Sequence, residues 1–425
     1  MTDKLRVGVL GSGPIAQAAH FESATKARNA ELYAICDVAA DLLERMACTH
    51  RPRKTFQDYG AMLADPDLDA VIIATADAFH VPATEAALKA GKHVLCEKPL
   101  GTSVEQVEAL KSVVAESGRV LQVGHMKRFD AGLQSARAFI SEEMGQLLAL
   151  KAWYCDSTHR YELTDAAQPL IVRSGTAKRP ARDPKADLLQ YYMLAHGSHL
   201  LDTARYLGGE ILQVQARFSE RFGAYCWFID VAFANGALGH LDLTIPVRMD
   251  WHEGFQIYGE NGSVIGKTYN RWLYKTSDVD IFHESTGTTT RVLSLDGHFY
   301  RRQLEGFAAT ILDAAPMRGA DVDDGIASVR AMVAVAQSVW HAPAWHRSRR
   351  RSIRPRRWRR TGGTKHDVTC CGLQARHQFG TDAVQTGSVP PGRSSALPGR
   401  TVQPRRETAR WCQLARTTRQ HPSGR

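Results

Sequence analysis

The sequence has no run of about 18 apolar residues, the length that a membrane-spanning helix requires, so we expect no membrane span. The first residues lack the apolar stretch of a signal peptide, because the chain passes from Met1 directly into a strand-like pattern at Arg6. Its eight cysteines do not have the spacing of metal ligands. We therefore expect a cytoplasmic protein with reduced thiols and without a metal site.

The first 340 residues also lack a net positive charge, although the whole chain has a net charge of +10. Residues 341–425 hold 18 arginines and one lysine against three carboxylates, a net charge of +16, which leaves −6 for the first 340 residues. Nucleic-acid binding by the folded part is therefore not expected. The arginine-rich segment has few aliphatic side chains and no apolar period, which is typical of a disordered tail. Two other interpretations are an out-of-frame translation of GC-rich DNA and a tail that binds anionic surfaces.

Residues 1–125 alternate between strand and helix patterns. Apolar runs predict strands at Arg6–Leu10, Glu31–Cys36, Ala70–Ala74, His93–Cys96 and Val120–Val123. A helical period between these strands predicts helices at Ile15–Lys26, Ala40–Cys48, Val81–Ala90 and Val104–Glu116. Nearly continuous apolar strands separated by helices predict a parallel sheet covered on both faces, an α/β Rossmann domain.

Residues 126–340 have a different pattern, in which strands follow one another directly. The predicted strands are Leu147–Tyr154, Ile211–Phe218, Cys226–Phe233, Ala237–Ile245 and Glu253–Tyr258. Asn235-Gly236 between two of them indicates a hairpin. Helix patterns cover Tyr191–Leu207, Arg301–Asp313 and Asp324–Trp340. We expect an α+β domain whose sheet is large, open-faced and mainly antiparallel.

The first predicted strand ends in Gly11-Ser12-Gly13-Pro14-Ile15-Ala16, a G-x-G-x-x-A sequence that also begins a helix. This is the context of a dinucleotide-binding loop: Gly11 permits the tight turn and Gly13 lets a pyrophosphate approach the backbone. Pro14 suits the first helical turn, and the helix N-terminus would face the phosphates.

Asp37 ends the second predicted strand, where a carboxylate can bind the ribose diol of a dinucleotide. Val38 follows it, so neither Arg nor Ser is present to bind a 2′-phosphate. These two residues favour NAD over NADP as the cofactor.

Three further stretches resemble the glucose–fructose oxidoreductase/inositol dehydrogenase/MocA family. They are Glu97-Lys98-Pro99 at a strand end, Thr75 with His80 five residues later, and residues 123–130, which include Arg128. The resemblance covers roughly residues 4–340. It implies a nicotinamide cofactor near Thr75, His80, Glu97 and Lys98, a small polyol substrate, and a homodimer or homotetramer.

The resemblance also implies the catalytic residues. In the family the lysine of Glu-Lys-Pro lies beside the nicotinamide and the substrate hydroxyl, which makes Lys98 a catalytic and substrate-binding candidate. His199 occupies the position of the general base in the family sequence Asp-x-Gly-x-His-x-x-Asp, and an ordinary histidine pKa would suit that role near neutral pH. Arg128 becomes a candidate substrate ligand.

This chain departs from the family sequence at one position, since Ala195 replaces the first Asp, one helical turn before His199. Tyr192 and His196 are candidates to compensate for this missing carboxylate and to bind substrate. Asp202 is interpreted as structural. A metal site formed by His196, His199 and Asp202 is an alternative, but it lacks a second group of ligands.

The resemblance therefore implies a dehydrogenase that oxidises a secondary hydroxyl of an inositol, an amino-inositol of the rhizopine type, or an aldose. Two alternatives remain open. The missing carboxylate at Ala195 is compatible with an NAD-binding sensor that has no turnover, because a fold does not determine a function. The second alternative is a glycosidase that uses bound NAD in a transient redox step.

Overall fold

The computed structural model describes residues 4–159, 168–176, 184–293 and 296–341. The arginine-rich segment lies outside these residues from position 342 onward, and the predictions made for it lie outside the described residues with it. No helix in the described ranges is long and apolar enough to cross a membrane.

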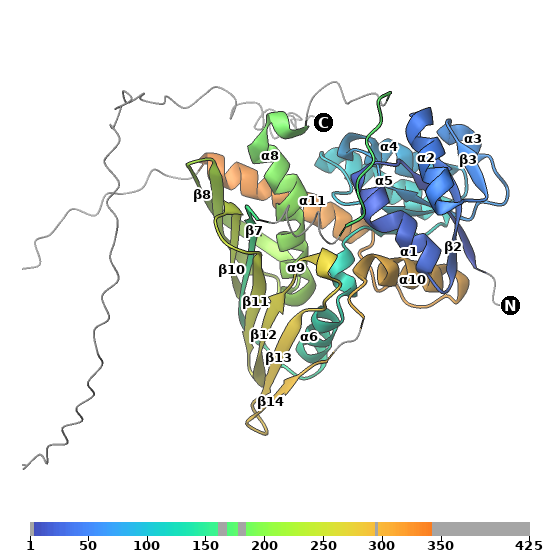
Figure 1. Cartoon of the computed structure of the whole chain (residues 1–425). Helices are drawn as coiled ribbons and strands as arrows, with labels where there is room; N and C mark the ends of the chain where they lie inside the picture. The colour runs from blue at the N-terminus through green and yellow to red at the C-terminus, as the bar shows by residue number, and fades with distance from the viewer. Residues whose placement is uncertain (1–3, 160–167, 177–183, 294–295, 342–425) are drawn as a thin grey trace, which may run out of the picture. The chain divides into compact units, whose positions relative to one another are not determined.

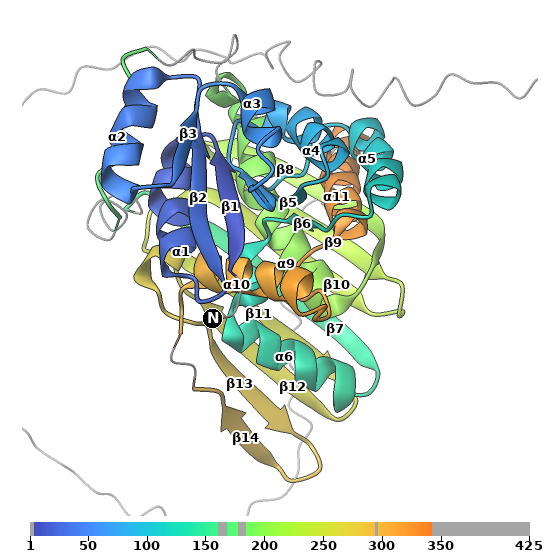
Figure 2. The ribbon, with the colours of Figure 1, turned by 90° about the vertical axis from the view of Figure 1, so that its right-hand side faces the viewer.

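The first domain contains a six-stranded sheet with the order β3-β2-β1-β4-β5-β6 (Figures 1 and 2). The strands are β1 (Leu5–Leu10), β2 (Ala30–Cys36), β3 (Lys54–Phe56), β4 (Ala70–Ile73), β5 (His93–Cys96) and β6 (Leu121–Val123), and every pairing is parallel. The order reverses between β1 and β4, where doubly wound sheets bind their ligands. The predicted Rossmann domain is confirmed.

The helices of this domain follow the strands in the expected alternation. They are the π-helical turn η1 (Ala16–His20) with α1 (Phe21–Lys26), α2 (Ala40–His50), α3 (Tyr59–Leu63), η2 (Asp77–Phe79), α4 (His80–Lys89) and α5 (Val104–Ser117). Gly118 ends α5 at φ +61°, a left-handed conformation that glycine adopts without strain. The sequence patterns do not predict β3 and α3, because elements of three and five residues are too short to show a period.

The second sheet has eight strands in the order β14-β13-β12-β11-β7-β10-β9-β8. Its strands are β7 (Leu147–Ser157), β8 (Ile211–Arg221), β9 (Ala224–Phe233), β10 (Leu238–Val247), β11 (His252–Gly259), β12 (Gly262–Thr268), β13 (Asp278–His283) and β14 (Thr288–Arg291). Among the described strands of this sheet, only β7 and β10 pair in parallel, so the predicted large and mainly antiparallel sheet is confirmed. The predicted hairpin at Asn235-Gly236 joins β9 to β10.

One face of the larger sheet is covered and the other is open. Helices α6 (Ala131–Glu142) and α9 (Ser198–Gly208) pack along the covered face (Figure 2). On β9 the side chains alternate between buried and exposed, as expected for a sheet with one solvated face. Phe228 on β9 and Ile265 on β12 lie on the open face and are 47% and 49% exposed.

The remaining described helical segments follow the strands of the first sheet in the chain. They are η3 (Met126–Phe129), η4 (Pro184–Ala186), α8 (Leu188–Tyr192), η5 (Met193–Gly197), η6 (Arg271–Leu273), α10 (Phe299–Leu312) and α11 (Val322–His341). The sequence patterns group α10 and α11 with the second domain. In the structure, Leu304 and Phe307 of α10 enter the core of the Rossmann sheet.

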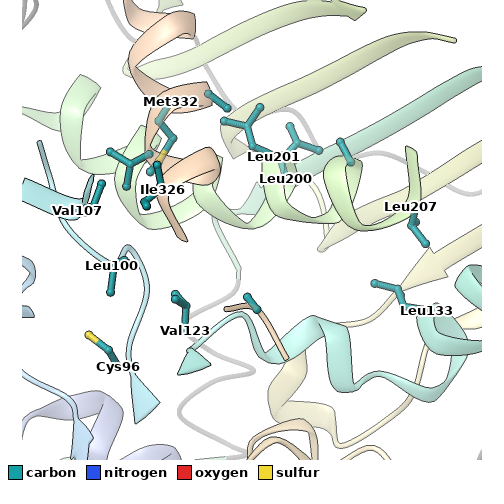
Figure 3. Close-up of a cluster of buried hydrophobic side chains, with 14 of the residues drawn as sticks. Cys96, Leu100, Val107, Val123, Leu133, Leu200, Leu201, Leu207, Ile326 and Met332 are labelled. Atoms are coloured by element: carbon teal, nitrogen blue, oxygen red, sulfur yellow. The ribbon is translucent and has the colours of Figure 1, made fainter. Parts of the chain in front are cut away.

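A continuous hydrophobic core runs from the first domain into the second. Figure 3 shows Cys96 and Leu100, on either side of Lys98, in the same cluster as Leu201 of α9 and Met332 of α11. The segment that carries Lys98 is therefore fixed between buried side chains. This packing places Lys98 against the helical region that carries His199.

Candidate active site

The glycine loop after β1 has the geometry of a dinucleotide-binding turn. Gly11 has φ +93°, and a Cβ atom there would lie 2.9 Å from the main-chain oxygen of Ala74. A Cβ atom at Gly13 would meet nothing within 4 Å, so there is open space over the loop. Pro14 and Ile15 begin the helix beside this space. The loop therefore fits a pyrophosphate bound at a helix N-terminus.

Asp37 lies directly after β2 and is tied to the same loop. Its carboxylate accepts hydrogen bonds from the main-chain N–H groups of Ser12, at 2.7 Å, and Ala39, at 2.8 Å. Val38 is 73% exposed and offers no charge for a 2′-phosphate. This arrangement fits the ribose of NAD.

His80 bridges the ends of β4 and β5. Its Nδ1 lies 2.7 Å from the main-chain oxygen of Pro99, and its Nε2 lies 3.2 Å from that of Thr75. The hydroxyl of Thr75 is buried and has no hydrogen-bond partner. Such an orphaned group at the switch point of the sheet is compatible with a ligand that supplies the missing partner.

Glu97 and Lys98 have different partners, although they are adjacent. The buried carboxylate of Glu97 lies 2.9 Å from Nε2 of His20 on η1, and it also accepts a hydrogen bond from the main-chain N–H of Lys98. The ammonium of Lys98 donates to the main-chain oxygen of Ala195 at 3.0 Å. Burial lowers the pKa of Lys98 from its ordinary value. Its contact with Ala195 joins the Rossmann domain to the helical segment that carries His196 and His199.

His199 is in the first turn of α9 and is only 3% exposed. Its ring is parallel to that of Tyr154 on β7, with the centroids 6.0 Å apart. Burial and the positive charges of Lys98, Lys127 and Arg271 lower its pKa well below 6.5. The expectation of an ordinary pKa for His199 is therefore wrong, because the sequence did not show that these cations converge on it. At neutral pH its imidazole is uncharged and can accept a proton.

His196 lies between the residues of β7 and those of α8. Its Nδ1 is 3.2 Å from the hydroxyl of Tyr154 and 3.5 Å from a carboxylate oxygen of Asp156. Its ring is also 5.8 Å, centroid to centroid, from that of Tyr192. The structure thus brings together the two sequence candidates that were expected to compensate for Ala195.

Comparison with known proteins agrees with this geometry. Residues 5–125 match the model of an oxidoreductase family with an NAD-binding Rossmann fold, and residues 136–265 match the C-terminal domain of the GFO/IDH/MocA family. This chain belongs to the GFO/IDH/MocA family. It is an NAD-dependent dehydrogenase, as the sequence resemblance implied.

Individual relatives of this GFO/IDH/MocA protein act on small polyols. Inositol 2-dehydrogenase 3 of Saccharopolyspora erythraea is 37% identical over 271 residues, covering 61% of this chain and 72% of the relative. The scyllo-inositol 2-dehydrogenase (NAD(+)) of Bacillus subtilis is 27% identical, covering 62% and 74%. The crystal structure of an aldose-aldose oxidoreductase from Caulobacter crescentus has the same fold, with a TM-score of 0.65, 20% identity, and coverage of 80% and 98%.

The side chain of Arg128 makes its contacts within the interior of this GFO/IDH/MocA protein. Its guanidinium forms buried ion pairs with Asp202, at 2.7 Å, and with Asp324, at 2.6 Å. These bonds engage Nε, Nη1 and Nη2. We therefore assign Arg128 to the packing of η3 against α9 and α11 and leave it out of the proposed substrate site. The structural interpretation of Asp202 agrees with this network.

Sequence reasoning missed four residues of the site, which are Tyr154, Asp156, Lys127 and Arg271. Lys127 forms a buried ion pair with Glu253 on β11, and its ammonium lies 4.4 Å from the centre of the Tyr154 ring. A usable signal existed on β7, where polar Tyr154 and Asp156 continue the face that begins with buried Leu150 and Ala152. Lys127 lies in the family-like stretch 123–130, but nothing in that stretch marks it as a residue of the site. Arg271 had no comparable signal, because its position depends on tertiary packing. Within the described residues no group of His, Cys, Asp and Glu side chains could hold a metal ion.

Proposed function

We propose that this dehydrogenase oxidises a secondary hydroxyl of a cyclitol or sugar. The observation that carries the proposal is the 3.0 Å hydrogen bond from Lys98 to the main-chain oxygen of Ala195. It holds an ammonium from the Rossmann domain one helical turn from His199, a buried imidazole. A cation and a neutral base at one place are the groups needed to bind a hydroxyl and to remove its proton.

The chain's own residues account for binding and proton transfer. Gly11, Gly13, Pro14 and Ile15 would hold the pyrophosphate of NAD, Asp37 its ribose, and Thr75, His80, Glu97 and Lys98 would surround its reactive end. Bound NAD supplies the acceptor for the hydride that leaves the carbinol carbon. Lys98 orients the hydroxyl and stabilises negative charge on its oxygen, while an imidazole nitrogen of His199 accepts the proton. His196 and Tyr192 bind the neighbouring hydroxyls.

The candidate substrates are inositols, amino-inositols of the rhizopine type and aldoses. The relatives named as inositol dehydrogenases support the first group, and the aldose-aldose oxidoreductase has the same fold. The test is NADH formation by the full chain with a panel of these compounds, in the wild type and in the Lys98→Ala and His199→Ala variants. Substrate-dependent NADH that disappears in both variants is the expected result.

Because Ala195 replaces the Asp of the family sequence, two other functions are alternatives. The same panel of compounds distinguishes them from a dehydrogenase. A sensor would bind NAD tightly and form NADH with no compound. A redox glycosidase would release an aglycone while the amount of NADH stays constant. Either result would overturn the proposal.

We also propose that the protein is a cytoplasmic homodimer or homotetramer. The open face of the larger sheet supports self-association, because large apolar side chains such as Phe228, Ile265 and Phe282 are exposed there. Light scattering of the wild type and of a Phe228→Glu variant would test it. A smaller assembly is expected for the variant, and a wild-type monomer would contradict the proposal.

A further inference from the structure

We propose that Asp156, acting through His196, supplies the carboxylate charge that Ala195 cannot supply. This inference rests on the proposed oxidation of a hydroxyl. It assigns Asp156 as a positioning residue of that reaction.

The backbone of β7 directs Asp156 to the covered face of the sheet. Tyr154 and Asp156 are two positions apart on the strand, so their side chains leave the same face. Tyr154 is fully buried and Asp156 is 4% exposed. Oδ1 of Asp156 accepts a hydrogen bond from the main-chain N–H of Ser157 at 2.8 Å, and Oδ2 lies 3.5 Å from Nδ1 of His196. The carboxylate is thus fixed with one oxygen toward the imidazole.

Tyr154 connects this pair to the general base. Its hydroxyl lies 3.2 Å from the same Nδ1 of His196, and its ring is parallel to that of His199. A carboxylate at position 195 would come from the helical segment that carries both histidines. Asp156 approaches His196 from strand β7 instead.

The charges around the site explain why a carboxylate is needed there. Lys98, Lys127 and Arg271 all act on His199, and each disfavours its protonated form. Three other nearby carboxylates have cationic or imidazole partners: Glu97 has His20, Glu253 has Lys127, and Asp202 has Arg128. Asp156 faces His196, and its charge also favours the protonated form of Arg271. It therefore offsets the positive charge that grows when the substrate proton arrives at His199.

Among the described residues, several titratable and charged groups face the two histidines and bear on a pH experiment. His196 faces Tyr154 and Asp156 on β7 and the rings of Tyr191 and Tyr192 on α8. His199 faces Tyr154 and the charges of Lys98, Lys127, Arg271 and His125. Removal of the Asp156 charge makes both imidazoles harder to protonate, so the acid limb of the pH profile should move to lower pH.

The experiment compares kcat, KM and the pH profile of four proteins: the wild type, Asp156→Asn, Ala195→Asp, and the double variant with both changes. We expect Asp156→Asn to lower kcat about tenfold or more and to shift the acid limb downward, with a smaller change in KM. The double variant should recover kcat and the position of the acid limb. Asp156→Glu keeps the charge and should keep the limb near its wild-type position, which separates charge from folding.

Asp242→Asn on the adjacent strand β10 is the matched control. Its carboxylate accepts from Thr244, and Asp242 pairs in register with Trp153, whose side chain leaves the opposite face from Tyr154. This variant should leave kcat and the pH profile unchanged. A wild-type kcat and acid limb in Asp156→Asn would overturn the inference. So would a double variant that folds, binds NAD and shows no recovery.

A second readout does not require a substrate. Histidine titration by ¹³C NMR, with the resonances assigned by His196→Gln and His199→Gln, measures the two imidazoles directly. We expect a lower pKa for His196 in Asp156→Asn and a return toward the wild-type value in the double variant. If no compound is oxidised, the proposed function fails while this titration still shows whether the Asp156–His196 pair exists. Unchanged titration in Asp156→Asn would refute the pair itself.

Discussion

His20 and Glu97 form a buried hydrogen bond, in which Nε2 of the imidazole lies 2.9 Å from Oε1 of the carboxylate. It joins the helix that follows the glycine loop to the residue before Lys98. Burial alone would raise the pKa of Glu97, but the hydrogen bond to His20 and the charges of His20 and Lys98 lower it. The carboxylate is therefore held ionised next to the site.

His20→Ala should destabilise the protein by about 1–3 kcal/mol, because it leaves the buried Oε1 of Glu97 without its imidazole partner. His50→Ala, which removes a half-buried ring that packs on Phe21, is the control and should cost less. Denaturant unfolding measures both. The pKa of Glu97 is lower in the folded state than its unfolded value of about 4.3, so its ionised carboxylate stabilises the folded state at pH values above the unfolded pKa. That stabilisation is lost as the pH falls through the lower folded pKa. Equal destabilisation by the two variants would contradict this account.

Lys98→Ala and His199→Ala should each lower kcat by about 10²–10⁴-fold, since each removes a group that acts on the hydroxyl. Tryptophan fluorescence titration should still show NAD binding in both. Because the pKa of His199 lies well below 6.5, kcat/KM of the wild type should stay constant as the pH falls through the ordinary histidine range. A profile that declines with an ordinary histidine pKa would show that His199 is more solvated than the structure indicates.

Asp37→Ala should weaken NAD binding and reduce the preference for NAD over NADP, because the carboxylate that would bind the ribose diol and repel a 2′-phosphate is lost. The change in the ratio of kcat/KM for the two cofactors is the measurement, and about tenfold is expected for the loss of a hydrogen bond to a charged group. Val38→Ala alters the adjacent exposed side chain and should leave the ratio intact. A ratio that does not change in Asp37→Ala would remove Asp37 from the cofactor site.

Asp202→Ala should lower the free energy of unfolding by about 1–3 kcal/mol, because it removes one of the two carboxylates that pair with the buried guanidinium of Arg128. Asp323→Ala breaks the exposed ion pair with Lys111 and should change the stability by less than about 1 kcal/mol. Thermal and denaturant unfolding of the two variants make the comparison. Similar values for both would show that the Arg128 network does not contribute to stability.

The elements of the first domain could be predicted from the sequence because their patterns are local. Strand β1, Gly11, Gly13 and Asp37 follow one another within 33 residues, and each requirement is written in residue type and spacing. The short strands β12 to β14 and helix α6 were not predicted. Their burial follows from neighbouring strands and from contacts across the larger sheet, so no single stretch carries the signal.

The candidate site likewise combines residues that could be predicted from the sequence with residues that could not. Lys98 and His199 could be named because each lies in a family motif. Asp156 and Arg271 could not, because they reach the site from β7 and η6, far from either motif in the chain. Arg128 was named as a substrate ligand from its motif, and the structure surrounds it with Asp202 and Asp324 instead.

By itself, the sequence determined the Rossmann domain, the second sheet domain and NAD as the cofactor, and it predicted that the glycine loop and Asp37 bind this cofactor. These features depend on periodicity, turn residues and residue types that are close in the chain. The tertiary structure decided which charges surround His199, which carboxylate faces His196 and what Arg128 binds. Electrostatic interactions act over a few ångströms in space and are strongest where water is excluded, and no linear pattern reports such distances.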